Sequence, residues 1–127
     1  MLNVNRVVLG GNVGGELRQD AAREECSFLL FSNDVTPPPD VFPDEVVQWK
    51  LDHPAAPMVH AFGDNAERVA RLGKGAFLLF EGELLTRKPS GGNLLITEVR
   101  MNRLLFYRPP RGREGEPSAM VSAGGAA

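Results

Sequence analysis

Residues 58–88 read MVHAFGDNAERVARLGKGAFLLFEGELLTRK and predict a strand, a short helix and a second strand in succession. Asp64 and Glu67 have the spacing of a capping box, which predicts that Asp64 is the N-cap of the helix. Gly73 is expected to end the helix, and an apolar run over residues 76–83 predicts the second strand. A helix of about two turns is unstable alone in water. It must therefore pack on a sheet that other segments build.

The composition fits one small domain. The chain has 127 residues, of which 43% are hydrophobic, and can bury one modest core. Its formal net charge of −2 hides a segregation of charge along the sequence. Residues 34–52 carry five acidic residues and one lysine, whereas residues 68–103 carry seven Lys or Arg and three Glu. The second of these segments is the one expected to attract a polyanion.

Cys26 is the single cysteine of the chain, so no intrachain disulfide can form and a reducing, cytoplasmic compartment is expected. The neighbouring Glu24 and Glu25 disfavour a thiolate, which predicts an inert thiol rather than a nucleophile. No stretch of about 18 apolar residues and no signal-peptide pattern occurs, so neither secretion nor a membrane span is expected.

Five apolar segments predict strands. They cover residues 4–13, 26–32, 58–62, 76–86 and 94–107. The last two are joined by turn-forming residues and predict a long hairpin. In the final strand, Leu95, Thr97, Val99 and Met101 alternate with Glu98, Arg100 and Asn102, which is the period of a strand.

The connecting segments are polar or rich in proline. Residues 16–25 predict a loop or a helical turn, and residues 36–43, with four prolines, predict a loop. A brief strand is expected within 45–51. Gly82 suits a bulge or a sharp bend in a curled sheet. Residues 108–127 are rich in Pro, Gly, Ala and Ser and predict a disordered tail.

This order of elements predicts an all-β OB-fold over residues 1–107, a five-stranded Greek-key barrel with one short α-helix between strands 3 and 4. The sequence also resembles the bacterial single-stranded DNA-binding protein family. The similar segments are VNRVVLGGNVGGELR at 4–18, SFLLFSND at 27–34, HAFGDNAERVARLGKGAFLLFEGELLTRK at 60–88 and the closing strand. The resemblance implies a homotetramer of OB-folds that binds and protects single-stranded DNA during replication, recombination and repair.

The resemblance also implies roles for individual residues. Phe62 corresponds to a base-stacking aromatic, and five basic residues lie where the family usually places phosphate contacts. These are Arg6, Arg71, Lys74, Arg87 and Lys88. Without the resemblance, Phe62 on a barrel strand is by default a core residue, and Arg71 and Lys74 can be no more than a solvated helix end. Trp49 is either a cap on the barrel end or a second stacking platform.

The chain departs from the family pattern in three places. Ala56 and Pro89 stand where the family usually has tryptophans, and the loop at 34–57 is acidic. The sequence ends in SAGGAA where the family usually has an acidic tip, so recruitment of other proteins through such a tip is not expected. These departures favour an alternative, an OB-fold protein-interaction module, similar to a primosomal replication protein, with weak affinity for DNA.

An enzyme or a nucleotide binder is the third hypothesis. The glycine-rich GGNVGG at 10–15 matches neither a dinucleotide-binding fingerprint nor a P-loop. His53 and His60 lack the neighbouring ligands of a zinc site. No nucleophile, base and orienting group recur at a recognisable spacing. We therefore expect no catalytic residues, no cofactor and no metal.

Overall fold

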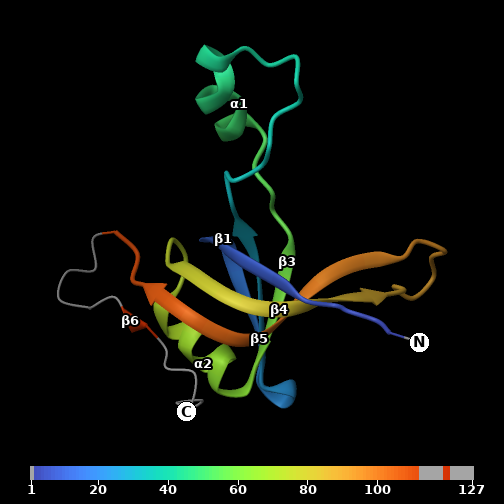
Figure 1. Ribbon diagram of the computed structural model, residues 1–127. Coiled ribbons are helices and arrows are strands. Elements are labelled where there is room, and N and C mark those ends of the chain that lie inside the picture. The colour runs from blue at the N-terminus through green and yellow to red at the C-terminus, as the bar shows by residue number, and fades with distance from the viewer. Residues whose placement is uncertain (1, 112–118, 121–127) are drawn as a thin grey trace.

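Five strands form the barrel of this protein in a computed structural model that describes residues 2–111 and 119–120. They are β1 (Val7–Asp20), β2 (Glu25–Phe31), β3 (Met58–Phe62), β4 (Phe77–Arg87) and β5 (Ile96–Arg108). The strand order is β3-β2-β1-β4-β5 with antiparallel neighbours, and a parallel pairing of β3 with β5 closes the barrel (Figure 1). The predicted OB-fold is confirmed.

The core lies inside the barrel and under one helix. Alternate residues of the strands point inward, as the period of two requires, and the largest fully buried side chains include Phe28, Leu30, Leu78, Phe80 and Leu104. Helix α2 (Gly63–Leu72) lies between β3 and β4 in the sequence, as predicted. It buries Ala66, Val69 and Leu72 against the barrel. The short helix is thus stabilised by packing rather than by its own length.

The start of α2 differs from the prediction. The N-cap is Phe62 at the end of β3, and no side chain caps the helix, so the predicted capping box of Asp64 is wrong. Strand and helix join without a loop because Gly63 has a φ of +59°, which only glycine adopts readily. The Gly63 N–H donates to the carbonyl oxygen of Glu24 at 2.9 Å. The Glu24 carbonyl oxygen thus satisfies one of the N–H groups that the start of a helix leaves without an intrahelical partner.

Strand β1 is longer than predicted. It continues through residues 16–20, where a loop or helical turn was expected, and a 3₁₀ turn (Ala21–Arg23) then leads into β2. The register shifts between Gly14 and Arg18, beyond which Arg18 pairs with Ser27. Most side chains of this extension are exposed. Leu17 is the one residue of the extension that packs against the core, and a single apolar residue gives no alternation from which the sequence could reveal a strand.

An arm, residues 33–54, projects from the barrel between β2 and β3 (Figure 1). Its base is fixed by two backbone hydrogen bonds between Ser32 and Ala55, of 2.9 and 2.8 Å. The proline-rich part is a loop, as predicted. The strand expected within 45–51 is wrong, because α1 (Val46–Asp52) forms there. Among the described residues no strand pairs with this region, whereas a helix satisfies its backbone groups internally.

The predicted hairpin of β4 and β5 and the predicted bulge at Gly82 are both confirmed. The strands pair from Phe77↔Arg108 to Arg87↔Ile96, with a register shift between Glu81 and Gly82. A Cβ on Gly82 would lie 2.1 Å from the carbonyl oxygen of Arg100. Only glycine allows the two backbones to approach this closely.

Most of the predicted tail lies outside the described residues. Strand β5 ends at Arg108, and Ala119–Met120 form a two-residue strand, β6, that pairs with Phe106 and Tyr107 of β5. Within residues 2–111 and 119–120, no helix is long and apolar enough to cross a membrane.

Candidate nucleic-acid interface

Phe62 lies at the seam where β3 meets β5. Its side chain is half-buried, and the guanidinium of Arg100 lies 4.9 Å from the centroid of its ring. The parallel pairing of His60 with Arg100 brings the side chains of Phe62 and Arg100 together. A cation–π contact at an exposed site contributes only about 0.5–1 kcal/mol. Arg100 can therefore move off the Phe62 ring so that a base stacks there. It can also stay beside the stacked base and contact a phosphate.

A polar network lies next to this aromatic contact. Nδ1 of His60 lies 2.7 Å from Oε1 of Glu25, and its buried Nε2 lies 3.1 Å from Oε1 of Glu98. Nε of Arg87 donates to the same Glu98 oxygen at 2.5 Å. The network joins β2, β3, β4 and β5 across the closing seam. It links β3 and β5, the strands that carry Phe62 and Arg100.

Glu98 is a buried charged residue. Only 4% of its surface is exposed, because His60 and Arg87 cover it from the neighbouring strands. Burial by itself raises the pKa of a carboxyl group, but the hydrogen bond from Arg87 and the interaction with His60 outweigh burial and lower the pKa of Glu98. The same contact raises the pKa of Arg87. Glu98 is therefore a paired, charged group at neutral pH.

This lowered pKa predicts a pH dependence of stability. A carboxylate whose pKa is lower in the folded state stabilises the fold above its unfolded pKa, here about 4.5, and loses that contribution as the pH falls through the folded value. We expect wild type to be more stable than Glu98→Gln at pH 7, and the difference to shrink below about pH 4.5. Urea denaturation of both proteins between pH 7 and pH 3 measures it. A constant difference over this range would contradict the pairing.

The predicted basic residues near the hairpin differ in how freely they can contact a phosphate. Arg87 is exposed but engaged by Glu98, and Arg6 forms an ion pair with Glu81, which also binds Arg103 at 3.1 Å. Lys88 is exposed at the start of the hairpin loop. An arginine in an ion pair must exchange its carboxylate for a phosphate, so Lys88 is the most accessible of the predicted basic residues beside the seam.

The structure does not bring Arg71 and Lys74 close to Phe62. Arg71 lies in the last turn of α2 and Lys74 follows it, whereas Phe62 precedes the first turn. A ten-residue helix is about 15 Å long, which sets the scale of their separation. Both side chains are exposed. They belong to a different part of the surface from Phe62.

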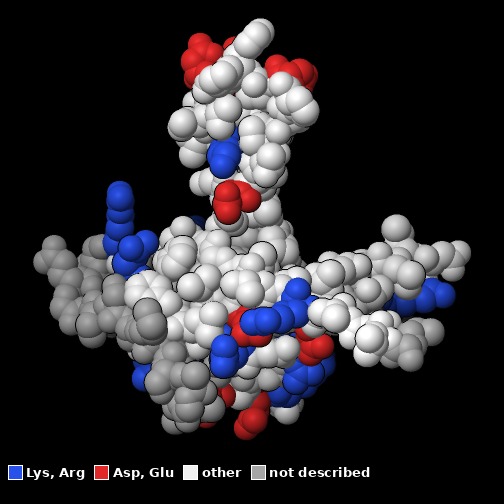
Figure 2. Space-filling view, viewed as in Figure 1, with Lys and Arg blue, Asp and Glu red and all other residues white. Residues whose placement is uncertain are grey.

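Trp49 lies on the projecting arm. Its half-buried ring stacks on His53, with centroids 4.3 Å apart and planes at 11°. Nδ1 of His53 lies 2.8 Å from the Trp49 carbonyl oxygen, which helps to hold the pair. Figure 2 shows Asp and Glu side chains on the same arm. A role for Trp49 as a stacking platform stays a prediction.

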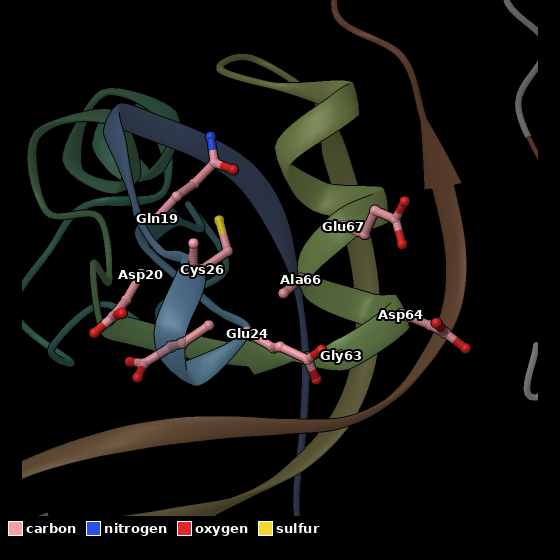
Figure 3. A pocket seen from close by; sticks show the side chains of 10 residues that line it. Gln19, Asp20, Glu24, Cys26, Gly63, Asp64, Ala66 and Glu67 are labelled. Carbon is pink, nitrogen blue, oxygen red and sulfur yellow. The ribbon is translucent and has the colours of Figure 1, made fainter.

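A cavity of about 380 Å³ lies beside the start of α2 (Figure 3). Carboxylates dominate its lining. They come from Asp20, Glu24, Glu25, Asp64 and Glu67. Cys26 also faces this cavity, where burial and then the charge of Glu25 raise the pKa of its thiol to about 11. The thiol is therefore protonated at neutral pH, and the acidic lining repels a polyanion from this side of Phe62.

The described part of the chain contains no cluster of three or more His, Cys, Asp or Glu that could hold a metal ion. Sequence patterns also missed the residues that surround Phe62. Arg100, His60, Glu25 and Glu98 come from three strands. Their proximity depends on the parallel β3–β5 register, for which the sequence carries no local signal.

No protein-family model matches the sequence, and no curated protein sequence matches it. Solved structures do match the fold. A small single-stranded DNA binding protein from Mycoplasma pneumoniae is 15% identical, with a TM-score of 0.55 over 81% of this chain and 93% of that one. The SSB of Plasmodium falciparum, solved in complex with ssDNA, is 19% identical, with a TM-score of 0.59 over 80% of this chain and 89% of that one. This chain therefore has the fold of these proteins.

Proposed function

We propose that this chain binds single-stranded DNA without strong sequence preference, by base stacking and phosphate neutralisation. The observation that carries the proposal is the half-buried Phe62 ring under the Arg100 guanidinium at the β3–β5 seam. Lys88 lies in the neighbouring hairpin loop. The shared fold with a single-stranded DNA binding protein and with an SSB that binds ssDNA supports the same conclusion.

The two kinds of contact explain affinity without specificity. Stacking of a base on an aromatic ring contributes about 1–3 kcal/mol, and every base offers a π-face. Phosphate contacts from Lys88 and Arg100 add a term that weakens with salt, because the release of condensed counterions gains less free energy when the surrounding salt concentration is high. Arg6 and Arg87 contribute where a phosphate displaces their carboxylate partners. None of these contacts reads the edge of a base.

We further propose a non-enzymatic, cytoplasmic homotetramer that protects single strands during replication, recombination and repair. Exposed apolar side chains on β1 and on the hairpin support self-association, among them Val8, Leu84 and Ile96. Light scattering at micromolar concentration measures the oligomeric state. A monomeric mass would contradict the tetramer and would leave DNA binding to be judged separately.

Binding of a labelled oligo-dT, followed by fluorescence anisotropy at low and high salt, tests the function. We expect the affinity to fall as salt rises and to persist when oligo-dC replaces oligo-dT. Trp49 is the single tryptophan, so its emission reports on the arm in the same titration. Quenching would support its predicted stacking role, whereas binding without quenching would assign stacking to Phe62 alone. An absence of binding at low salt would overturn the proposed function.

The arm favours a second candidate, an OB-fold module that binds another protein. Phe42, Val47 and Leu51 are exposed on the arm, where the surrounding charge is acidic. Such a surface suits a protein partner better than a polyanion. If the protein fails to bind oligo-dT, this candidate becomes the leading one.

A further inference from the structure

A second basic surface lies at the far end of β5 from Arg100. A groove of about 1040 Å³ forms there between the start of β4, the end of β5 and the loop after α2. Three cationic side chains line it, Lys74, Arg108 and Arg111, together with the ring of Phe77. No acidic residue is among the described residues that line it. Figure 2 shows Lys and Arg side chains at this end of the barrel.

The cations of this groove are available for a ligand. Across residues 2–111, none of Lys74, Arg108 and Arg111 forms an ion pair. This differs from Arg6 and Arg87, whose guanidinium groups are engaged by carboxylates. A phosphate that enters the groove therefore displaces no carboxylate, and the three charges reinforce one another in attracting it.

The groove is held in place by the sheet. The loop before β4 is fixed to β1 because Gly75 N–H donates to the Val13 carbonyl oxygen at 2.8 Å, and Val13 N–H donates to that of Ala76 at 2.8 Å. The Asn12 side-chain amide donates to the Gly75 carbonyl oxygen at 3.2 Å. Gly75, with φ of +91°, lies so close to Pro110 that an added Cβ would come within 3.2 Å of the proline Cβ. The loop before β4 and the segment after β5, which form two walls of the groove, thus approach closely at Gly75 and Pro110.

An aromatic residue orients one of the cations. Phe77 and Arg108 are opposite each other in the β4–β5 pairing, and the Arg108 guanidinium lies 5.2 Å from the centroid of the Phe77 ring. Phe106 packs against the same ring, edge to face, with centroids 6.1 Å apart. A guanidinium on an aromatic ring combined with unpaired charge is the combination that binds single-stranded nucleic acid.

We propose that this groove binds a second stretch of the same DNA strand, through the phosphodiester backbone. The inference rests on the proposed function. Arg100 and Arg108 lie eight residues apart on β5, so the two surfaces are separated by at most about 26 Å along the strand. A strand bound at Phe62 can therefore continue over the barrel to Lys74, Arg108 and Arg111. Its path avoids the acidic cavity beside the start of α2.

The double variant K74A/R111A tests this path. It removes two charges without touching a buried side chain, and thermal unfolding checks that the barrel stays folded. With an oligo-dT of about 30 residues we expect weaker binding at low salt, and a salt slope reduced by about 1.4, since each phosphate contact to a single strand contributes about 0.7. The variant R18A/R23A removes the same charge from exposed arginines elsewhere on β1 and the following turn. Its salt slope should remain close to that of wild type.

The outcomes separate the two proposals. If wild type binds oligo-dT and K74A/R111A shows the same salt slope, the groove is not part of the path, and the proposed function stands without it. If R18A/R23A loses as much slope as K74A/R111A, overall charge explains the effect and the groove proposal is overturned. If wild type does not bind oligo-dT at all, the proposed function fails and the groove proposal fails with it.

Discussion

Replacing Phe62 with Ala is expected to weaken binding of oligo-dT by about 5- to 150-fold. This range corresponds to the loss of about 1–3 kcal/mol of stacking with one base. The ring is half-buried and its partner Arg100 is exposed, so the barrel keeps its core when the ring is removed. Fluorescence anisotropy measures the affinity, and chemical denaturation of the same variant measures the stability.

Two further results decide how Phe62 acts. Phe62→Tyr keeps an aromatic ring and should bind within about threefold of wild type, because stacking depends on the π-face. If Phe62→Ala binds DNA as well as wild type does and only loses stability, Phe62 is a core residue. The alternative of a protein-interaction module would then gain support.

Replacing Phe80 with Ala is expected to destabilise the protein by about 3–5 kcal/mol. Phe80 is 0% exposed in the middle of β4, between β1 and β5, and its removal leaves a cavity that the closed barrel cannot fill by local adjustment. Because domains are stabilised by only about 5–15 kcal/mol, this is a large share of the total. Urea denaturation should show a lower midpoint with an unchanged slope.

Phe42→Ala is the matched control for this substitution. Phe42 lies on the arm with 67% of its surface exposed, so the same change in side chain should alter the free energy of unfolding by no more than about 0.5 kcal/mol. A similar loss in both variants would mean that the arm packs against something in solution, for example a second copy of the chain. Such a result would support the proposed oligomer.

Much of the barrel could be predicted because its strands bury one face. The apolar run at Met58–Phe62 predicted β3 with its observed bounds, and Gly82 predicted the bulge in β4. The predicted secondary structure was wrong where the local sequence pattern and the surrounding tertiary structure favour different conformations. Val46 and Val47 favour a strand, yet in the part of the chain that the structure describes no strand pairs with them, and a helix forms. The helix α2 begins at Gly63, before the Asp64 that the capping-box spacing suggested as N-cap, because Gly63 adopts a positive φ and its N–H donates to the Glu24 carbonyl oxygen.

The candidate site was harder to predict than the fold. The resemblance to a known family singled out Phe62, which lies at the seam, and Lys88, which is exposed at the start of the hairpin loop. It could not indicate that Glu98 engages Arg87 or that Arg100 covers the ring, because these contacts join residues of β3, β4 and β5 that are 11 and 38 positions apart in the sequence. Side-chain pairing across a closed barrel depends on its register, and a single sequence does not encode register in any local motif.

The two hydrogen bonds between Ser32 and Ala55 make the arm a self-contained insertion. These hydrogen bonds fix the points where the chain leaves and re-enters the barrel. The length of the arm between Ser32 and Ala55 can therefore change without changing the β2–β3 register. Doubling the length of such a loop costs only about 0.6 kcal/mol of closure entropy. This position therefore allows chains with the same barrel to gain, lose or exchange an entire appendage, and with it a partner, while the barrel stays unaltered.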